Sequence, residues 1–293
     1  MTPQQVEEKK IQMQGSLAGI GAVLKKNNDQ IVINTVIPAS PAGKAGLKAG
    51  QVITAINAIP TATMTIDDAV KLIRGPKGTQ VELTVTDSSD AKTQRVAIVR
   101  DIVTLVAATG RVLDGNVGLL TITNFSEAVP KQVKNILESF ATLGVKGVVL
   151  DLRDNGGGSL NAAVEVAGLF VGKEPVLWLR KKTSEKQAQP FHASENAMCQ
   201  SPMVVLVNRL TAAGAELVAS ALQTSKRATV VGQKTFGMDP NQSPDFLTAN
   251  GKPIAGVGIQ PDVPLDANLS KEEALKKAVE LLPKQDVKPN SKG

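Results

Sequence analysis

The sequence predicts two domains of different class, a small and mostly β module followed by a larger α/β core. Short apolar stretches broken by glycine and proline fill residues 15–103, which is typical of a β-rich module. After about residue 104, strand-like and helix-like segments alternate, which favours βαβ units with ligand chemistry at the carboxyl ends of the strands. The expected segments are a helical lead-in at 1–14, the β module at 15–103, the α/β core at 104–283 and a flexible tail at 284–293.

The composition excludes several classes of protein. With 42% hydrophobic and 20% charged residues, the 293-residue chain fits a globular protein rather than a fibrous or disordered one. The net charge of +6 comes from short, scattered basic runs without interleaved aromatic residues, which argues against nucleic-acid binding. The single cysteine, Cys199, allows no internal disulfide and is expected to be a small, semi-buried residue.

Neither a membrane span nor a secretory signal is expected. No apolar run reaches the roughly 18 residues that a span requires, and the chain opens on a polar, acidic stretch. A leader removed earlier stays open as an alternative.

The β module contains one clear helix among its strands. Thr65 is expected to cap this helix, at 66–74, and Asp68 to close a capping box, before Gly75 and Pro76 end it. Strands are expected at 31–37, 51–57 and 80–86.

The core shows regular alternation of strands and helices. Gly144 is expected to end the first of its helices. Strands are expected at 118–123, 147–152, 203–207 and 228–231, and helices at about 127–143, 160–170 and 212–223.

A glycine-framed turn, Gly19-Ile-Gly-Ala22, leads into the β module. Consecutive amides in such a turn can bind a carboxylate, and a strand edge beside a helix makes a groove for an extended peptide. Together with Ser40–Gly50, Val52–Asn57 and Ile73–Thr79, this turn resembles a PDZ domain. The resemblance implies that protein C-terminal tails are bound by Gly19, Ile20, Gly21 and Ala22, with Arg74 at the end of the helix. Gln51 departs from the usual Asp, at a turn outside the groove.

A second glycine motif, Asp151-Leu-Arg-Asp-Asn-Gly-Gly-Gly158, follows a buried strand. Glycines leave backbone amides open to a reacting oxygen. After the PDZ module, the chain carries this motif and then three further segments, Val204–Asn208, Lys234–Gly237 and Gly256–Asp262. This order of segments resembles that of the C-terminal processing peptidases, also called tail-specific proteases.

This family resemblance implies a crotonase-like α/β peptidase core with an inserted PDZ domain. It implies serine peptidase chemistry by a Ser-Lys dyad, without a metal or organic cofactor, and a location outside the cytoplasm (periplasmic, secreted or lumenal). The family's oxyanion amides map onto Gly157 and Gly214. The opening Met1-Thr-Pro-Gln-Gln resembles the segment that precedes the family's PDZ domain. The resemblance implies a helical region in front of this segment that the given sequence does not contain, so a truncated chain and a naturally short one both stay open.

The chain departs from the family at both dyad positions. Ala213 occupies the nucleophile position and Met238 the general-base position. Gln242 corresponds tentatively to a glutamine that orients the lysine, in a segment shorter than the family's. A methyl group cannot attack and a thioether cannot accept a proton near neutral pH, so this dyad is expected to be inactive.

Three explanations of these replacements stay open: natural loss of peptidase activity, an engineered inactive form, or a peptidase with substitute residues. Thr211 and Lys234 are the substitutes that lie nearest in sequence. Ser159 is better explained as a helix cap, Ser220 as a helix-face residue, and His192 as a surface side chain.

We therefore predict a protein that binds C-terminal tails without cutting them. The competing hypothesis is an active serine-type endopeptidase that cleaves near substrate C-termini. A third is a structural partner that forms a homo- or hetero-oligomer with an active relative.

Overall fold

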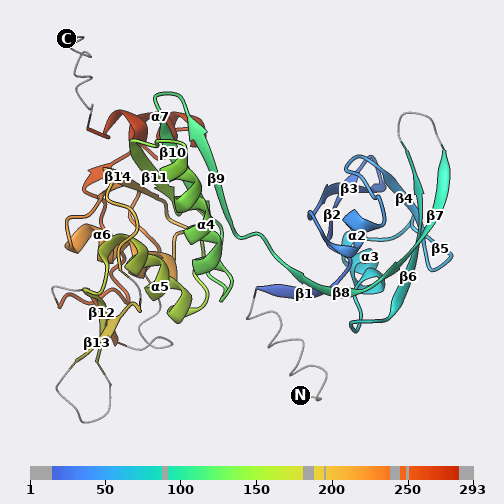
Figure 1. Ribbon diagram of the computed structural model, residues 1–293, viewed down its shortest axis with the longest axis horizontal. Helices are drawn as coiled ribbons and strands as arrows, with labels where there is room; N and C mark the ends of the chain where they lie inside the picture. Colours follow the sequence, from blue (N-terminus) through green and yellow to red (C-terminus); the bar gives the residue numbers. More distant parts are fainter. Residues whose placement is uncertain are drawn as a thin grey trace. The chain divides into compact units, whose positions relative to one another are not determined.

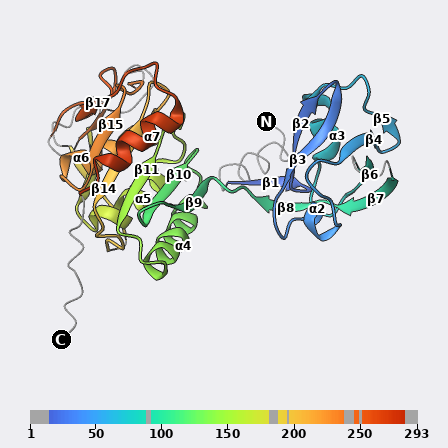
Figure 2. The same ribbon diagram turned by 90° about the horizontal axis from the view of Figure 1, so that it is seen from above.

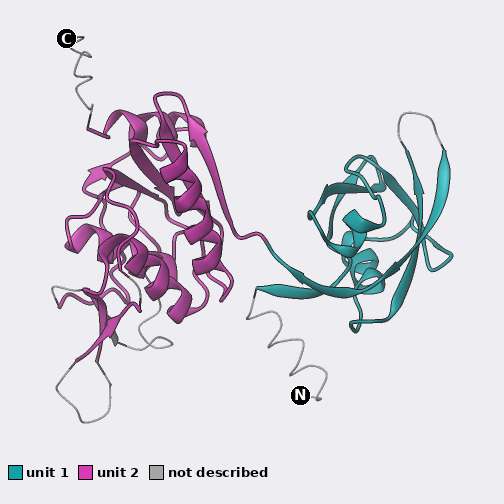
Figure 3. Cartoon of the chain, in the orientation of Figure 1, with its two compact units in different colours: residues 1–105 teal, residues 106–293 magenta. Residues whose placement is uncertain are grey.

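The computed structural model divides into two compact units, residues 1–105 and 106–293 (Figure 3). The expected lead-in at 1–14 and tail at 284–293 lie outside the described residues, and so do Met238 and Gln242. The structure describes residues 15–87, 92–180, 188–194, 196–237, 245–248 and 251–283.

The first unit is built on an antiparallel sheet with the strand order β2-β3-β4-β6-β7, to which β5 adds by pairing with β4 (Figure 1). Strand β2 lies at one edge of this sheet, so one side of its backbone has no neighbouring strand in the described residues. The strands are β2 (Ala22–Asn27), β3 (Gln30–Val36), β4 (Val52–Ile56), β5 (Ile59–Pro60), β6 (Gln80–Thr86) and β7 (Thr93–Val99).

Helix α3 (Ile66–Ile73) has the N-terminus that the sequence predicts. The Thr65 hydroxyl accepts a hydrogen bond from the Asp68 amide, and the Asp68 carboxylate accepts one from the Thr65 amide. Ala69 and Ile73 face the core of the unit, where they pack with side chains of β3, β4 and β6. The short helix α2 (Pro41–Lys44) is capped by Ser40.

Two further strands form an antiparallel ribbon at the ends of the first unit. β1 (Ser16–Gly19) pairs with β8 (Asp101–Thr104), from Ser16 opposite Thr104 to Gly19 opposite Asp101. β1 runs directly into the predicted carboxylate-binding turn, so β8 fixes one side of that turn.

The second unit is organised around a six-stranded sheet with the order β17-β15-β14-β11-β10-β9 (Figure 2). Its strands are parallel except β9, which pairs antiparallel with β10. The parallel strands place their carboxyl ends at one edge, as βαβ units require. The bounds are β9 (Ala108–Leu113), β10 (Val117–Ile122), β11 (Gly147–Asp151), β14 (Met203–Val207), β15 (Thr229–Gly232) and β17 (Val263–Pro264).

Helices cover both faces of this sheet. Three helices, α4 (Val129–Thr142), α5 (Leu160–Val171) and α6 (Gly214–Thr224), share a large apolar cluster with one face. Helix α7 (Lys271–Glu280) packs Ala278 against the opposite face, next to Val149 and Leu206. Alternate residues of each strand thus enter separate cores, because successive side chains of a strand point to opposite faces.

Several elements were not expected from the sequence. They include α7, which carries a readable capping box between Ser270 and Glu273. Others form a three-stranded antiparallel sheet of β12 (Pro175–Arg180), β13 (Gln189–His192) and β16 (Asp245–Leu247). Strands β1, β5, β7, β8, β9 and β17 and the short helix α2 were not expected either.

Among the described residues, no helix has both the length and the apolar character needed to cross a bilayer.

Candidate functional site

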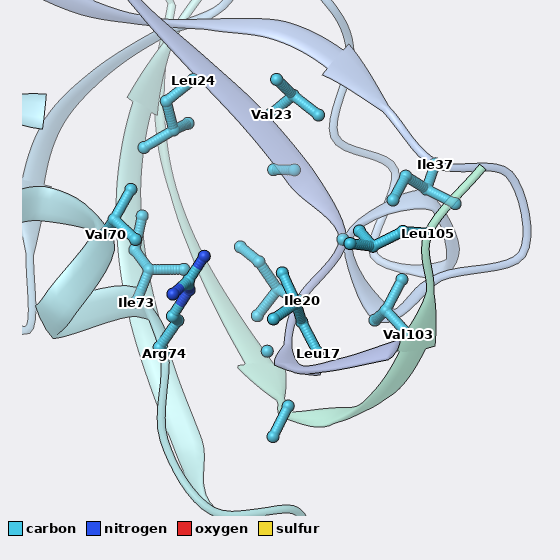
Figure 4. A pocket seen from close by; sticks show the side chains of 14 residues that line it. Leu17, Ile20, Val23, Leu24, Ile37, Val70, Ile73, Arg74, Val103 and Leu105 are labelled. Atoms are coloured by element: carbon cyan, nitrogen blue, oxygen red, sulfur yellow. The ribbon is translucent and has the colours of Figure 1, made fainter. Parts of the chain in front are cut away.

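An apolar groove opens between the free edge of β2 and helix α3 (Figure 4). Its volume is about 270 Å³. All of the residues that the sequence assigns to tail binding, Gly19 to Ala22 and Arg74, line it. The apolar side chains that line it include Leu17, Ile20, Leu24, Val70, Ile73 and Leu105.

The turn between β1 and β2 directs backbone amides away from the surrounding structure. The Ile20 carbonyl accepts a hydrogen bond from the Ala42 amide at 2.8 Å, and the Gly21 carbonyl accepts one from the Ile37 amide at 2.9 Å. In a trans peptide the N–H points opposite to the C=O. The amides of Gly21 and Ala22 therefore face away from Ala42 and from β3, toward the groove side of β2.

Gly21 is required by this turn on two grounds. Its φ is +81°, in the region that favours glycine, and a Cβ there would lie 2.3 Å from the Ser40 Cβ. Gly19 differs, because a Cβ at that position would meet nothing within 4 Å.

Arg74 lies at the rim of the groove, where α3 ends (Figure 4). Its side chain is exposed and forms no ion pair or hydrogen bond within the described residues. Its charge is therefore open to a ligand that occupies the groove.

The second candidate site lies at the carboxyl ends of β11 and β14. The glycine motif follows β11, and Ala213 precedes α6 on the connection after β14. A Cβ placed on Gly157 would lie 2.6 Å from the Ala213 Cβ and 2.9 Å from the Gly214 nitrogen. The structure thus brings together Gly157, Ala213 and Gly214, which the sequence associates with one another.

Comparison with known proteins identifies the family of this chain. A family model described as peptidase family S41 matches residues 116–265, and a PDZ domain model matches residues 32–87. The chain belongs to peptidase family S41. It has a PDZ domain and is a member of the C-terminal processing peptidases.

Individual relatives agree with this assignment. The chain is 32% identical to a carboxyl-terminal-processing protease of Synechocystis, over 87% of this chain and 60% of that protein. It is 33% identical to the carboxy-terminal processing protease CtpA of Bacillus subtilis, over 85% of this chain and 56% of that protein. A solved photosystem II D1 C-terminal processing protease aligns with a TM-score of 0.52 at 26% identity, covering 95% of this chain and 81% of that one. The chain thus spans less than two thirds of the length of the Synechocystis and Bacillus subtilis proteases.

Ala213 of this S41 homologue has a backbone conformation that alanine rarely adopts. Its φ and ψ are 49° and −119°, and its amide donates to a Glu216 carboxylate oxygen at 3.0 Å. A conformation of this kind costs about 1–3 kcal/mol and persists only where the surroundings impose it. The strained turn is therefore present at a residue whose side chain is a methyl group.

The backbone amides of Gly157 and Gly214, which the family resemblance assigns to an oxyanion, differ in whether another group already accepts their hydrogen bonds. The Gly157 amide donates to Asn155 Oδ1 at 2.8 Å, and the Asn155 side-chain nitrogen donates to the Ile122 carbonyl at 2.8 Å. The Gly214 amide has no acceptor in the described residues. Asn155, which is 0% exposed, was not singled out from the sequence, although it stands inside the glycine motif.

Glu216 is a second residue that sequence reasoning missed. It is 0% exposed, and besides the Ala213 amide it accepts hydrogen bonds from the Thr235 hydroxyl and the Gly237 amide. This carboxylate therefore holds the segment that leads to Met238 against the start of α6. The available signal was its spacing of three residues after Ala213, which is that of a capping box.

Thr211 does not present a free nucleophile. It is 0% exposed, and its hydroxyl donates to the Leu152 carbonyl at 2.9 Å while accepting from the Asn208 amide at 2.9 Å. Lys234 is exposed. The substitute Thr-Lys pair considered from the sequence therefore lacks an available hydroxyl.

The remaining candidates have structural roles. Ser159 caps α5 by accepting from the Ala162 amide, and its hydroxyl donates to Glu127. Ser220 is buried on α6, while the exposed His192 makes a hydrogen bond to the Lys173 carbonyl. Within the described ranges, no group of three or more His, Cys, Asp or Glu side chains is arranged to hold a metal ion.

A charged network supports the glycine motif from the side of α7. Arg153 pairs with Asp151 and donates to the Lys271 carbonyl at 2.7 Å, and the Lys271 ammonium pairs with Asp154. The hydrogen bond from Lys271, followed by that from Asn208, lowers the pKa of Asp154.

Replacing Ala213 by glycine should not destabilise the core, because glycine adopts the observed backbone angles without strain. We expect a free energy of unfolding that is unchanged or up to about 1 kcal/mol higher. Urea unfolding monitored by the single tryptophan, Trp178, measures it. Ala219→Gly, inside α6, is the control and should cost about 1 kcal/mol or more. Equal losses in both variants would show that Ala213 is not strained.

Asp154→Asn should lower stability at neutral pH and have little effect in acid. Because the folded-state pKa of Asp154 is lowered, its contribution is present above the unfolded value of about 3.9 and is lost as the pH falls through the folded pKa. Urea unfolding of both proteins across this range tests it. Asp114→Asn, which alters an exposed hairpin carboxylate, is the control. A difference between wild type and Asp154→Asn that persists undiminished in acid would contradict the assignment.

Proposed function

We propose that this member of family S41 binds the C-terminal tails of proteins in its PDZ groove and does not cut them with the family's Ser-Lys dyad. The observation that carries the proposal is the combination of outward-facing amides at Gly21 and Ala22 with an apolar cavity beside the free edge of β2. These are the elements that bind an extended chain ending in a carboxylate.

In the proposed complex, the tail adds as a strand to the edge of β2. Backbone hydrogen bonds to β2 give affinity, and alternate side chains of the tail enter pockets. The terminal carboxylate accepts hydrogen bonds from the amides of Gly21 and Ala22. The last side chain of the tail enters the cavity between Ile20 and Val70. Arg74, which lines the groove at the end of α3, contacts residues of the tail upstream of its end in this complex.

The absence of cleavage follows from the residues at the dyad positions. Ala213 offers no oxygen, and Met238 offers no basic nitrogen. In subtilisin, removal of the nucleophile alone lowers turnover by about a million-fold. The Gly157 amide, one of the two oxyanion positions, is also engaged by Asn155 in this structure.

The resemblance to C-terminal processing peptidases further supports a location outside the cytoplasm as part of this proposal. The proposal also includes association with an active relative, because a chain that binds tails without cutting them can present substrates to another peptidase.

Peptides with a free C-terminal carboxylate should bind this protein at least about tenfold more tightly than their C-terminal amides, because the amide cannot accept equally from the Gly21 and Ala22 N–H groups. Fluorescence anisotropy with labelled peptides ending in Ala, Val, Leu or Phe measures both forms. Gly21→Ala should abolish the preference. Gly46→Ala changes another positive-φ glycine that lies off the groove lining and should keep it. Equal binding of acid and amide would refute the carboxylate site.

Incubation of the protein with an unfolded substrate that carries the best-binding tail should yield no cleavage product by mass spectrometry. The matched proteins are Thr211→Val and Lys234→Ala. A product that wild type forms and that either variant abolishes would show an active peptidase with substitute residues. Tail binding without cleavage supports the proposal.

A further inference from the structure

Arg100 is a buried arginine at the end of β7 that the tail-binding hypothesis does not use. It is 7% exposed, and no carboxylate pairs with it in the described part of the chain. A buried guanidinium is costly unless its donors are satisfied. The hydrogen-bond acceptors of the Arg100 guanidinium therefore show which elements it holds together.

Two of these acceptors are carbonyls at the end of α3. The Nε atom donates to the Ile73 carbonyl at 2.7 Å, and an Nη atom donates to the Leu72 carbonyl at 2.9 Å. The last carbonyls of a helix lack partners within the helix and are commonly satisfied by a glycine-based C-cap. Here the C-cap residue, Arg74, is extended, with φ −69° and ψ 159°. The Arg100 side chain takes the place of such a cap.

The other Nη atom connects α3 to the sheet. It donates to the Thr79 hydroxyl at 2.9 Å and to the Gln80 carbonyl, at the start of β6, at 2.8 Å. Four of the five N–H donors of the guanidinium are thus engaged.

The backbone of Arg100 extends the connection to the opposite side of the groove. Asp101, the next residue, begins β8, which pairs with β1 up to Gly19. The backbone itself is held by the Thr79 carbonyl, which accepts from the Arg100 amide at 2.7 Å, and by the Gly78 amide, which donates to the Arg100 carbonyl. One residue therefore joins the helix that carries Val70 and Ile73 to the ribbon that carries the carboxylate-binding turn.

We propose that Arg100 is a positioning residue for tail binding, which sets the spacing between α3 and the β1–β8 ribbon. This inference rests on the proposed function. Lysine cannot replace Arg100, because a single ammonium group cannot reach acceptors at both the helix end and β6. A methionine keeps much of the apolar stem and loses every donor.

The test uses the full-length chain and the tightest-binding free-carboxylate peptide of the panel described above. Arg100→Lys and Arg100→Met should each weaken binding by at least about tenfold at a temperature where circular dichroism shows both to be folded. Arg95→Met, which removes an exposed arginine from the same strand, should bind as wild type does.

Gly75→Ala supplies a variant that keeps Arg100. A Cβ on Gly75 would lie 3.0 Å from Arg100 Nε and 3.1 Å from Cζ, so it should displace the guanidinium and weaken binding by a smaller factor. This variant tests the inference even where the Arg100 replacements fail to fold.

Hydrogen exchange separates positioning from a general loss of stability. Positioning predicts faster exchange at the C-terminal end of residues 66–74 with little change in β3 and β4. Folded variants that bind with wild-type affinity would overturn the inference. So would a loss of binding that is fully accounted for by the fraction of the variant that is unfolded. By contrast, a wild type that binds no carboxylate peptide, or binds its amide equally, refutes the proposed function itself.

Discussion

The directions of a few backbone amides decide what each site can do. At the turn before β2, the carbonyls of Ile20 and Gly21 are bound by neighbouring amides, and the next N–H groups consequently face the groove. At the second site, the Gly157 amide donates to Asn155 and the Ala213 amide to Glu216, while the Gly214 amide has no acceptor in the described residues. Since a buried amide needs a partner, a turn whose amides lack internal acceptors is suited to a ligand, and one whose amides are occupied is not.

The geometry around Ala213 shows that the strained turn does not depend on a reactive side chain. Glu216 binds the Ala213 amide and also the Thr235–Gly237 segment, while Thr211 binds the Leu152 carbonyl beneath it. These contacts hold the backbone from several sides, which is what a conformation of this cost requires. The surroundings thus set the conformation of this turn, and alanine occupies it.

Local signals in the sequence predict much of this molecule. The capping box of α3, the strand at residues 80–86 and the glycine turn all depend on neighbours within a few residues, and the structure has each of them. Arg100 could not be found this way, because it binds carbonyls more than twenty residues away in the chain. The pairing of β12 with β16 likewise joins segments that are distant in the chain. Asn155 was visible within its motif, but the direction of its side chain depends on the Ile122 carbonyl.

The acceptors around Arg100 have a consequence for acidic surroundings. Three are backbone carbonyls and one is a hydroxyl, so none of them gains a proton as the medium is acidified. The tie between α7 and the glycine motif includes the carboxylate of Asp154 and does weaken under those conditions. Acid would thus loosen the hold of α7 on the glycine motif, while the Arg100 side chain would keep every acceptor that fixes the end of α3.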